Sequence, residues 1–192
     1  MSRVRANTTG ADYDDESLKL EYERVGFKDQ LSSTTMRVLH PKNGVPRNGV
    51  LVFTRYIEEA DTLCAKLRGV GIRAAIVTGE TPKKEREDIL EDFKVGDIKV
   101  VANVGTLTTG FDYPELDTVI LGRPTKSLAL YYQMVGRAIR PFKGKDGWIV
   151  DLGGSYRRFG DVSDLKIDKE SPSSTRWCIT SKGRQLTNVM FY

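Results

Sequence analysis

Short apolar runs alternate with amphipathic segments through the middle of the chain. The apolar runs predict strands at residues 50–53, 72–77, 98–104, 118–121 and 148–152. Between them, apolar residues recur at every third or fourth position, which predicts helices around residues 60–67, 82–94 and 127–140. Strands that are apolar on both faces and alternate with helices are typical of a parallel sheet covered on both sides. The pattern therefore predicts an α/β fold.

The first 47 residues are more polar and are predicted to form an N-terminal extension. Residues 1–17 include an acidic cluster between positions 12 and 16 and carry few apolar side chains, so we expect loop or disorder there. Ser17 is expected to cap a short helix that ends at Val25, with the acidic cluster favouring its positive N-terminus.

Turn-forming residues indicate where the main domain begins. Proline, glycine and asparagine are dense between residues 41 and 49, so the main domain is expected to span residues 48–160. Residues 161–192 are expected to form a small C-terminal extension. A β-hairpin is predicted there, with its two strands at residues 176–180 and 186–192.

Glycines and hydroxyl residues follow the predicted strands. In open parallel sheets, ligands bind beyond the carboxyl ends of the strands. The residues expected at that edge are Thr54 and Arg55, Thr78 to Glu80, Gly105 to Asp112, and Gly122 with Arg123. A surface rich in glycine and hydroxyl groups suits contact with phosphates.

Two stretches carry the densest candidate chemistry. Residues 103–114 combine glycines, threonine hydroxyls and Asp112, although the end of this stretch can also be explained as a turn whose aspartate bonds its own backbone. On a helix over residues 127–140, Gln133, Arg137 and Arg140 would share one face, opposite a buried apolar face made by Leu130, Met134, Val135 and Ile139. Two arginines at that spacing suit a polyphosphate, and the alternative is a pair of solvated charges.

Composition and charge limit the metal sites, the cellular compartment and the partners that can be expected. The chain has 192 residues, a formal net charge of +4, two cysteines and one histidine. This inventory cannot build the usual four-ligand zinc site alone, so no metal ligands are predicted. We expect a reducing, cytoplasmic setting, and no apolar run approaches the roughly 20 residues needed to span a bilayer. The basic balance is compatible with a polyanionic partner.

Three segments together resemble the motifs of a known family. Val50 to Thr54 resembles motif IV, residues 103–114 resemble motif V, and the Gln133 to Arg140 stretch, with its Gly-Arg-x-x-Arg element, resembles motif VI of superfamily 2 helicases. Their order and spacing agree with the second, C-terminal RecA-like lobe of such a motor, a P-loop-NTPase-type α/β fold. Within the superfamily, residues 107–112, 123–127 and 151–154 resemble bacterial and phage helicases of the restriction-enzyme-subunit type more than DEAD-box RNA helicases.

The resemblance implies a set of roles. ATP with Mg²⁺ would lie in a cleft between two lobes, with Arg140 as the arginine finger, Arg137 holding phosphates or coupling the lobes, and Gln133 positioning the nucleotide or the attacking water. The other residues that it implies at the nucleotide are Gly110, Asp112 and Gly136. The residues that it implies at the nucleic-acid backbone are Thr54, Arg55, Gly79, Thr106 and Thr108.

The sequence also departs from a complete motor. It contains no G-x-x-x-x-G-K-S/T loop and no Asp-Glu pair after a strand, which are the elements that hold the phosphates and Mg²⁺. We therefore expect this chain alone to be inactive, with ATP and Mg²⁺ held mainly by an N-terminal RecA-like lobe in the same longer chain or in trans. DNA is the expected polymer and RNA the alternative. The competing interpretations are a nucleic-acid or protein-binding adaptor derived from a helicase lobe, and an unrelated doubly wound domain that binds a small phosphorylated ligand.

Overall fold

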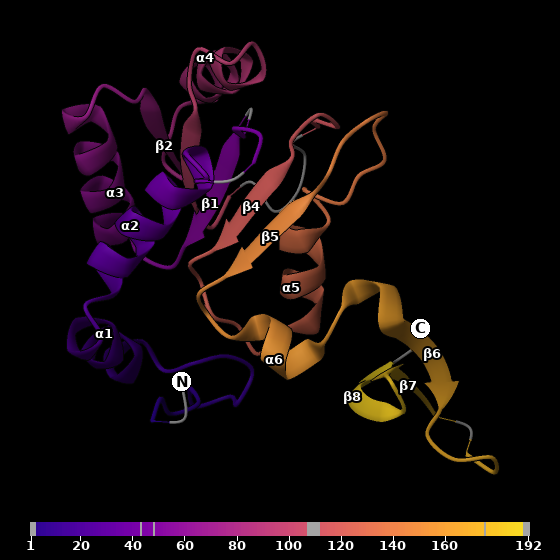
Figure 1. Ribbon diagram of the computed structural model, residues 1–192. Helices are drawn as coiled ribbons and strands as arrows, with labels where there is room; N and C mark the ends of the chain where they lie inside the picture. The colour runs from indigo at the N-terminus through magenta and orange to yellow at the C-terminus, as the bar shows by residue number, and fades with distance from the viewer. Residues whose placement is uncertain (1–2, 43, 48, 107–111, 175, 190–192) are drawn as a thin grey trace.

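A five-stranded parallel sheet forms the centre of the protein (Figure 1). The computed structural model describes residues 3–42, 44–47, 49–106, 112–174 and 176–189. The strand order is β2-β3-β1-β4-β5, and every neighbouring pair is parallel. The strands are β1 (Val50–Thr54), β2 (Ala74–Thr78), β3 (Val100–Val104), β4 (Thr118–Leu121) and β5 (Trp148–Asp151). The predicted α/β parallel sheet is confirmed.

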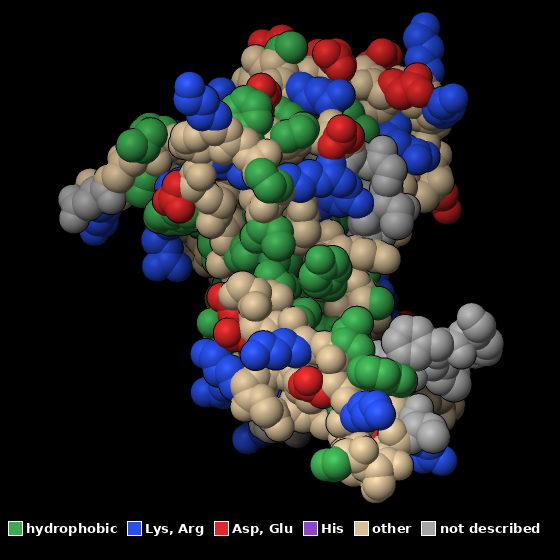
Figure 2. All heavy atoms as spheres, turned by 90° about the vertical axis from the view of Figure 1, so that its right-hand side faces the viewer, with side chains coloured by type: hydrophobic (Ala, Val, Ile, Leu, Met, Phe, Trp, Pro, Cys, Tyr) green, Lys and Arg blue, Asp and Glu red, His purple; other side chains and the backbone are tan. Residues whose placement is uncertain are grey.

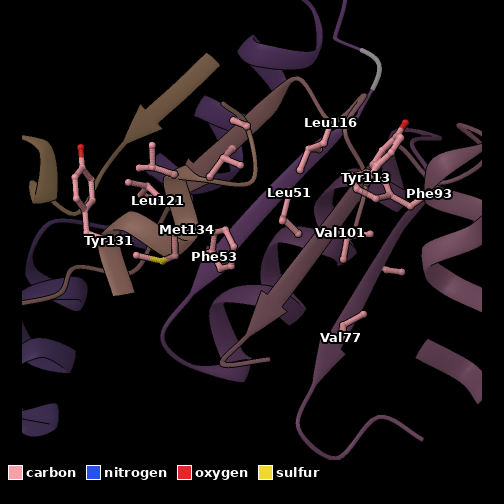
Figure 3. Close-up of a cluster of buried hydrophobic side chains, with 14 of the residues drawn as sticks. Leu51, Phe53, Val77, Phe93, Val101, Tyr113, Leu116, Leu121, Tyr131 and Met134 are labelled. Carbon is pink, nitrogen blue, oxygen red and sulfur yellow. The ribbon is translucent and has the colours of Figure 1, made fainter. Parts of the chain in front are cut away.

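Helices cover both faces of this sheet. On one face lie α1 (Asp15–Arg24), α2 (Phe27–Leu39) and α3 (Ile57–Gly69), and on the other lie α4 (Lys83–Lys94) and α5 (Leu128–Val135). All five residues of β1 are buried, and the first four point their side chains alternately into the two hydrophobic cores. Leu51 and Phe53 point toward Phe93 of α4 and Met134 of α5 (Figure 3). The continuous apolar run in the sequence reflects burial on both sides.

The N-terminal segment packs onto the sheet. The α1 helix begins at Asp15, and its cap is Asp14, whose carboxylate accepts from the Ser17 backbone N–H at 2.9 Å. The predicted cap at Ser17 is therefore wrong by three positions, because an aspartate placed earlier already satisfies that N–H. Residues 3–14 are held as a loop by a bridge between Ala6 and Tyr13, and Tyr13 is buried.

The α2 helix was not predicted from the sequence. Its run of Ser32, Ser33, Thr34 and Thr35 has low intrinsic helix propensity, so burial rather than propensity stabilises it. Leu31 and Thr35 are fully buried in this helix, and α2 packs against α3. The hydrophobic core is thus continuous across residue 48, where the sequence placed the domain boundary. That boundary stays a prediction.

A second, antiparallel sheet follows the main domain. After α6 (Ser155–Phe159) and a 3₁₀ turn (Val162–Asp164), it contains β6 (Leu165–Lys169), β7 (Trp177–Ser181) and β8 (Arg184–Val189). Lys182 and Gly183 link β7 to β8, and both have positive φ, as a two-residue hairpin turn with the right twist requires. Strand β6, which was not predicted, is exposed over most of its length and extends the hairpin to three strands.

Glu59, in the first turn of α3, is a buried carboxyl group that makes stability depend on pH. Burial raises its pKa from 4.5 to about 7, although its Oε2 accepts a hydrogen bond from the Tyr56 N–H at 2.8 Å. A group whose pKa is higher in the folded than in the unfolded state stabilises the fold while protonated and loses that contribution as the pH rises. From pH 4.5 to about 7, the wild-type protein should therefore lose stability relative to Glu59→Gln.

The measurement is the melting temperature of both proteins across this pH range. The two values should lie close together at the acidic end and separate towards neutral pH, with the variant higher. Glu23→Gln, at an exposed position on α1, is the control and should follow the wild type. A difference between Glu59→Gln and wild type that does not change with pH would contradict the prediction.

Candidate nucleotide and nucleic-acid interface

The arginines of the predicted motif VI lie just beyond the end of α5. Ser127 caps this helix by accepting from the Leu130 N–H at 3.2 Å, and the helix ends at Val135. Residues 136–140 form turns, not a continuing helix. Gly136 lowers helix propensity here, and Pro141 disfavours a helical conformation at the residue before it. Gln133, Arg137 and Arg140 therefore do not share one helical face, and that prediction is corrected.

Arg140 forms an ion pair with Asp112. The side chain of Arg140 is 34% exposed and that of Asp112 is 80% exposed, so the pair lies at the surface. Asp112 belongs to the predicted motif V and Arg140 to motif VI, so the structure joins two segments that lie 28 residues apart in the chain. A partly exposed guanidinium paired with an exposed carboxylate can exchange that partner for a phosphate group.

Arg137 is placed differently from Arg140. It is only 8% exposed, so the expectation that both arginines extend freely toward a ligand is wrong for Arg137. Burial lowers its pKa, and the neighbouring charge of Arg140 acts in the same direction. Ile139, predicted to be buried, is exposed, while Gln133 is exposed as expected. A Cβ at Gly136 would lie 2.9 Å from the Tyr132 carbonyl oxygen, so the tight turn that leads to Arg137 favours glycine.

The predicted nucleic-acid residues occupy the carboxyl edge of the sheet. Gly79 follows β2, Thr106 follows β3 and Arg55 follows β1, and these strands are neighbours in the sheet. Gly79 is exposed with open space around it, and Thr106 is half-buried. Thr54 is 1% exposed, which disagrees with the expectation that its side chain faces a ligand. Thr108 and Gly110 lie outside the described residues.

Arg55 contacts the N-terminal acidic segment. Its guanidinium pairs with Asp12 at 3.0 Å and with Asp15 at 2.9 Å, and its side chain is 13% exposed. Burial lowers the pKa of Arg55, but these two carboxylates more than offset that effect and raise it overall. The predicted phosphate ligand is thus occupied by carboxylates of the same chain.

Asp12 is the centre of this arrangement, a role that no pattern in the sequence indicates. Its carboxylate accepts from the backbone N–H of Lys126 at 3.1 Å and from its own neighbour Tyr13 at 2.9 Å. The guanidinium of Arg123 lies 3.7 Å away. Two arginines and two backbone N–H groups around one anion are the kind of partners that also hold a phosphate. As a sequence pattern, the acidic cluster indicates only disorder and a favourable interaction with the helix dipole.

Two features are not found among the described residues. No three His, Cys, Asp or Glu side chains gather in a way that could hold a metal ion. No helix in these parts of the chain is long and apolar enough to cross a membrane.

The fold and these motif positions define a RecA-like helicase lobe. Residues 33–141 match the family described as Helicase conserved C-terminal domain, and the chain belongs to that family. The predicted resemblance to superfamily 2 helicases is confirmed.

The chain is also similar to longer curated proteins. It is 39% identical over 143 residues to the putative mitochondrial ATP-dependent helicase irc3 of Schizosaccharomyces pombe, a match that covers 74% of this chain and 24% of that protein. It is 32% identical over 133 residues to a 51.5 kDa protein of Lactococcus phage (isolate 7-9), covering 68% of this chain and 29% of the relative. The chain thus spans less than a third of the length of these relatives.

Solved structures share the fold. The C-terminal domain of the DEAD-box protein Dbp5 aligns with a TM-score of 0.55 at 22% identity, over 66% of this chain and 69% of that chain. The ATP-dependent type ISP restriction-modification enzyme LlaBIII, bound to DNA, aligns with a TM-score of 0.54 at 25% identity, over 66% of this chain and 10% of that chain. The similarity to LlaBIII agrees with the predicted resemblance to restriction-type helicases.

Proposed function

We propose that this chain is the C-terminal motor lobe of an ATP-dependent DNA helicase or translocase. The observation that carries the proposal is the surface ion pair between Arg140 and Asp112, with Arg137 buried beside it. In this arrangement the Arg140 guanidinium can exchange its carboxylate partner for a phosphate, and the Arg137 guanidinium lies buried next to it. A lobe that completes an ATP site from across a cleft requires such a cation. The likeness to LlaBIII, which was solved with DNA, supports DNA over RNA.

Each residue has a proposed role. Arg140 leaves Asp112 and neutralises charge that develops on the transferred γ-phosphate, and buried Arg137 sets the position of Arg140 and couples the lobes. Gln133, Gly136 and the motif V residues Gly110 and Asp112 adjoin the nucleotide. The residues that contact the nucleic-acid backbone are Arg55, Gly79, Thr106 and Thr108. Thr54 is buried and stabilises the same edge of the sheet from within the protein.

ATP bound with Mg²⁺ supplies the phosphoryl group and the metal charge, and we assign both mainly to an N-terminal RecA-like lobe. This chain contributes cations and backbone donors. The donor set fits the task, because Arg140 is partly exposed and its present partner is itself an anion. The cytoplasmic location expected from the sequence stays a prediction.

The test compares phosphate release by this chain with release by the two-lobe motor that contains it. The chain alone should release no phosphate from ATP, whereas the two-lobe protein should do so and should be stimulated by DNA. If the two-lobe protein binds DNA without hydrolysing ATP, the motor interpretation is wrong and the adaptor interpretation takes its place. If RNA stimulates hydrolysis and DNA does not, the nucleic acid is RNA.

Removing the Asp12 carboxylate should strengthen DNA binding. In Asp12→Asn, Arg55 and Arg123 lose a charged partner, so more positive charge faces an incoming phosphate. We expect a decrease in Kd on the order of tenfold at low salt, because one interaction of about 1.4 kcal/mol corresponds to that factor. The effect should shrink at high salt.

The measurement is fluorescence anisotropy with labelled single-stranded DNA at several salt concentrations. Asp97→Asn is the matched control, since Asp97 is exposed and pairs with Arg73 at 3.7 Å near the amino end of β3, away from the carboxyl edge. Equal changes in both variants would mean that net charge alone is responsible, and the local role of Asp12 would be refuted.

A further inference from the structure

A second group of cations lines a hollow beyond the carboxyl ends of β4 and β5. We call it the basic groove and define it by Lys126, Arg157, Arg158 and Arg184. The cavity has a volume of about 850 Å³. Lys126 follows β4, the two adjacent arginines lie on α6, which follows β5, and Arg184 begins β8 of the antiparallel sheet. None of these residues belongs to motifs IV, V or VI.

The groove carries an excess of positive charge. Within the described residues, no carboxylate lies within ion-pair distance of its four cations. Glu21 also lines the cavity, but Arg24 binds both of its carboxylate oxygens, at 2.8 and 2.9 Å. In Figure 2, which shows the side that carries the antiparallel sheet, Lys and Arg side chains lie at the height that α6 has in Figure 1, with some Asp and Glu side chains among them.

Several of these cations are held in place. The Arg158 guanidinium donates to the Tyr13 hydroxyl at 3.3 Å, and Arg184 donates to the backbone carbonyl of Arg158. The Lys126 ammonium lies 5.4 Å from the centre of the Tyr13 ring. Tyr13 and Phe159 are buried and form part of the apolar lining. Ordering these side chains in advance lowers the entropic cost of binding an anion.

The basic groove continues the edge that carries the motif residues. In the spatial order of the sheet, Arg55 follows β1, Lys126 follows β4 and Arg158 lies beyond β5. Asp12 joins the first two, because it accepts hydrogen bonds from the Arg55 guanidinium and from the Lys126 N–H. Neighbouring strands are about 4.8 Å apart, so the segments that carry these cations leave the sheet side by side.

We propose that the basic groove binds the sugar-phosphate backbone of the nucleic-acid strand, extending its path from the motif residues to the antiparallel sheet. This inference rests on the proposed function. The proposal assigns a function to the C-terminal extension, because Arg184 lies on β8. Contacts of this kind are made to phosphates, so they add affinity without reading sequence.

The test is anisotropy with the 192-residue chain and a labelled oligo-dT of about 20 nucleotides, long enough to exceed typical single-strand site sizes. The variant Arg157→Gln/Arg158→Gln/Arg184→Gln should raise Kd on the order of tenfold or more. It should also make the negative slope of log K against log salt shallower by about 2, since each of the three lost phosphate contacts on a single strand contributes about 0.7.

Two further variants keep the result interpretable. Lys42→Gln/Lys99→Gln/Lys143→Gln removes the same charge from exposed positions near the amino ends of the strands, and its Kd should rise far less. Arg157→Gln alone leaves the hydrogen bonds of Arg158 and Arg184 intact, and should raise Kd about threefold with an unchanged melting temperature.

The outcomes separate this inference from the proposed function. Equal losses of DNA affinity in the two triple variants, or no loss in either, would refute the proposal that the basic groove binds the nucleic-acid backbone. So would a wild-type chain that binds polyglutamate but not oligo-dT, which would indicate an acidic protein as the partner. The proposed function fails on a different result, namely a two-lobe motor without DNA-stimulated ATP hydrolysis, whatever the groove variants do.

Discussion

Replacing Arg140 with alanine in the two-lobe motor is expected to lower the turnover number for ATP by about 10³-fold or more. Arg140 is partly exposed and pairs with Asp112 at the surface, so the lobe should fold without it. The lost guanidinium would otherwise neutralise charge that is greater in the transition state than in bound ATP. Affinity for nucleic acid should change little, because Arg140 lies at the end of α5, which runs away from the carboxyl edge.

The measurement is steady-state phosphate release at saturating DNA, together with DNA binding in the absence of ATP. Lys143→Ala is the matched control, since Lys143 is an exposed cation three positions further along the chain. Its turnover should remain close to wild type. Unchanged turnover in Arg140→Ala would refute the assignment of the arginine finger, and a parallel loss of DNA binding would show that the residue acts on the lobe as a whole.

Phe53→Ala is expected to have the largest effect on stability. Phe53 is 2% exposed on the central strand and points toward α5 (Figure 3). Truncation of a buried phenylalanine removes its burial and leaves a cavity, which costs about 3–5 kcal/mol. The loss should also disturb Thr54 and Arg55, which directly follow Phe53 at the candidate interface.

Urea unfolding followed by circular dichroism measures this cost. Leu20→Ala, at a side chain that is 62% exposed on α1, is the control and should change the free energy of unfolding by less than about 0.5 kcal/mol. A cost below about 1 kcal/mol for Phe53→Ala would mean that the site collapses around the smaller side chain.

The central sheet was predictable because most of its strands are buried on both faces. Strands buried on both faces read as apolar runs, and β4 begins and ends at the predicted residues. The errors lie where tertiary contacts outweigh local preference. Helix α2 forms through a serine and threonine run because the core buries its apolar side. Residues 165–168 of β6 alternate between apolar and charged, which is the period of a strand, but the segment is short and mostly exposed, so pairing with β7 decides its conformation.

The candidate site was predictable in part. The motifs indicated Arg140 and Asp112 separately, and the ion pair joins them. The burial of Arg137 could not be foreseen, because it follows from the end of α5 at Val135 and not from a helical repeat. The partnership of Asp12 with Arg55 spans 43 residues, and no local pattern encodes such a contact. The basic groove likewise collects cations from three separate segments.

The carboxylate of Asp12 also bears on which ligands the interface would accept. Any phosphate that binds Arg55 must first compete with a tethered anion, whose effective concentration is high because it belongs to the same chain. A single free phosphate or a mononucleotide makes too few contacts to win that competition. A polymer can hold neighbouring cations first and then displace the carboxylate step by step. Discrimination between monomers and polymers would thus arise from multivalency, without any pocket shaped for a particular base.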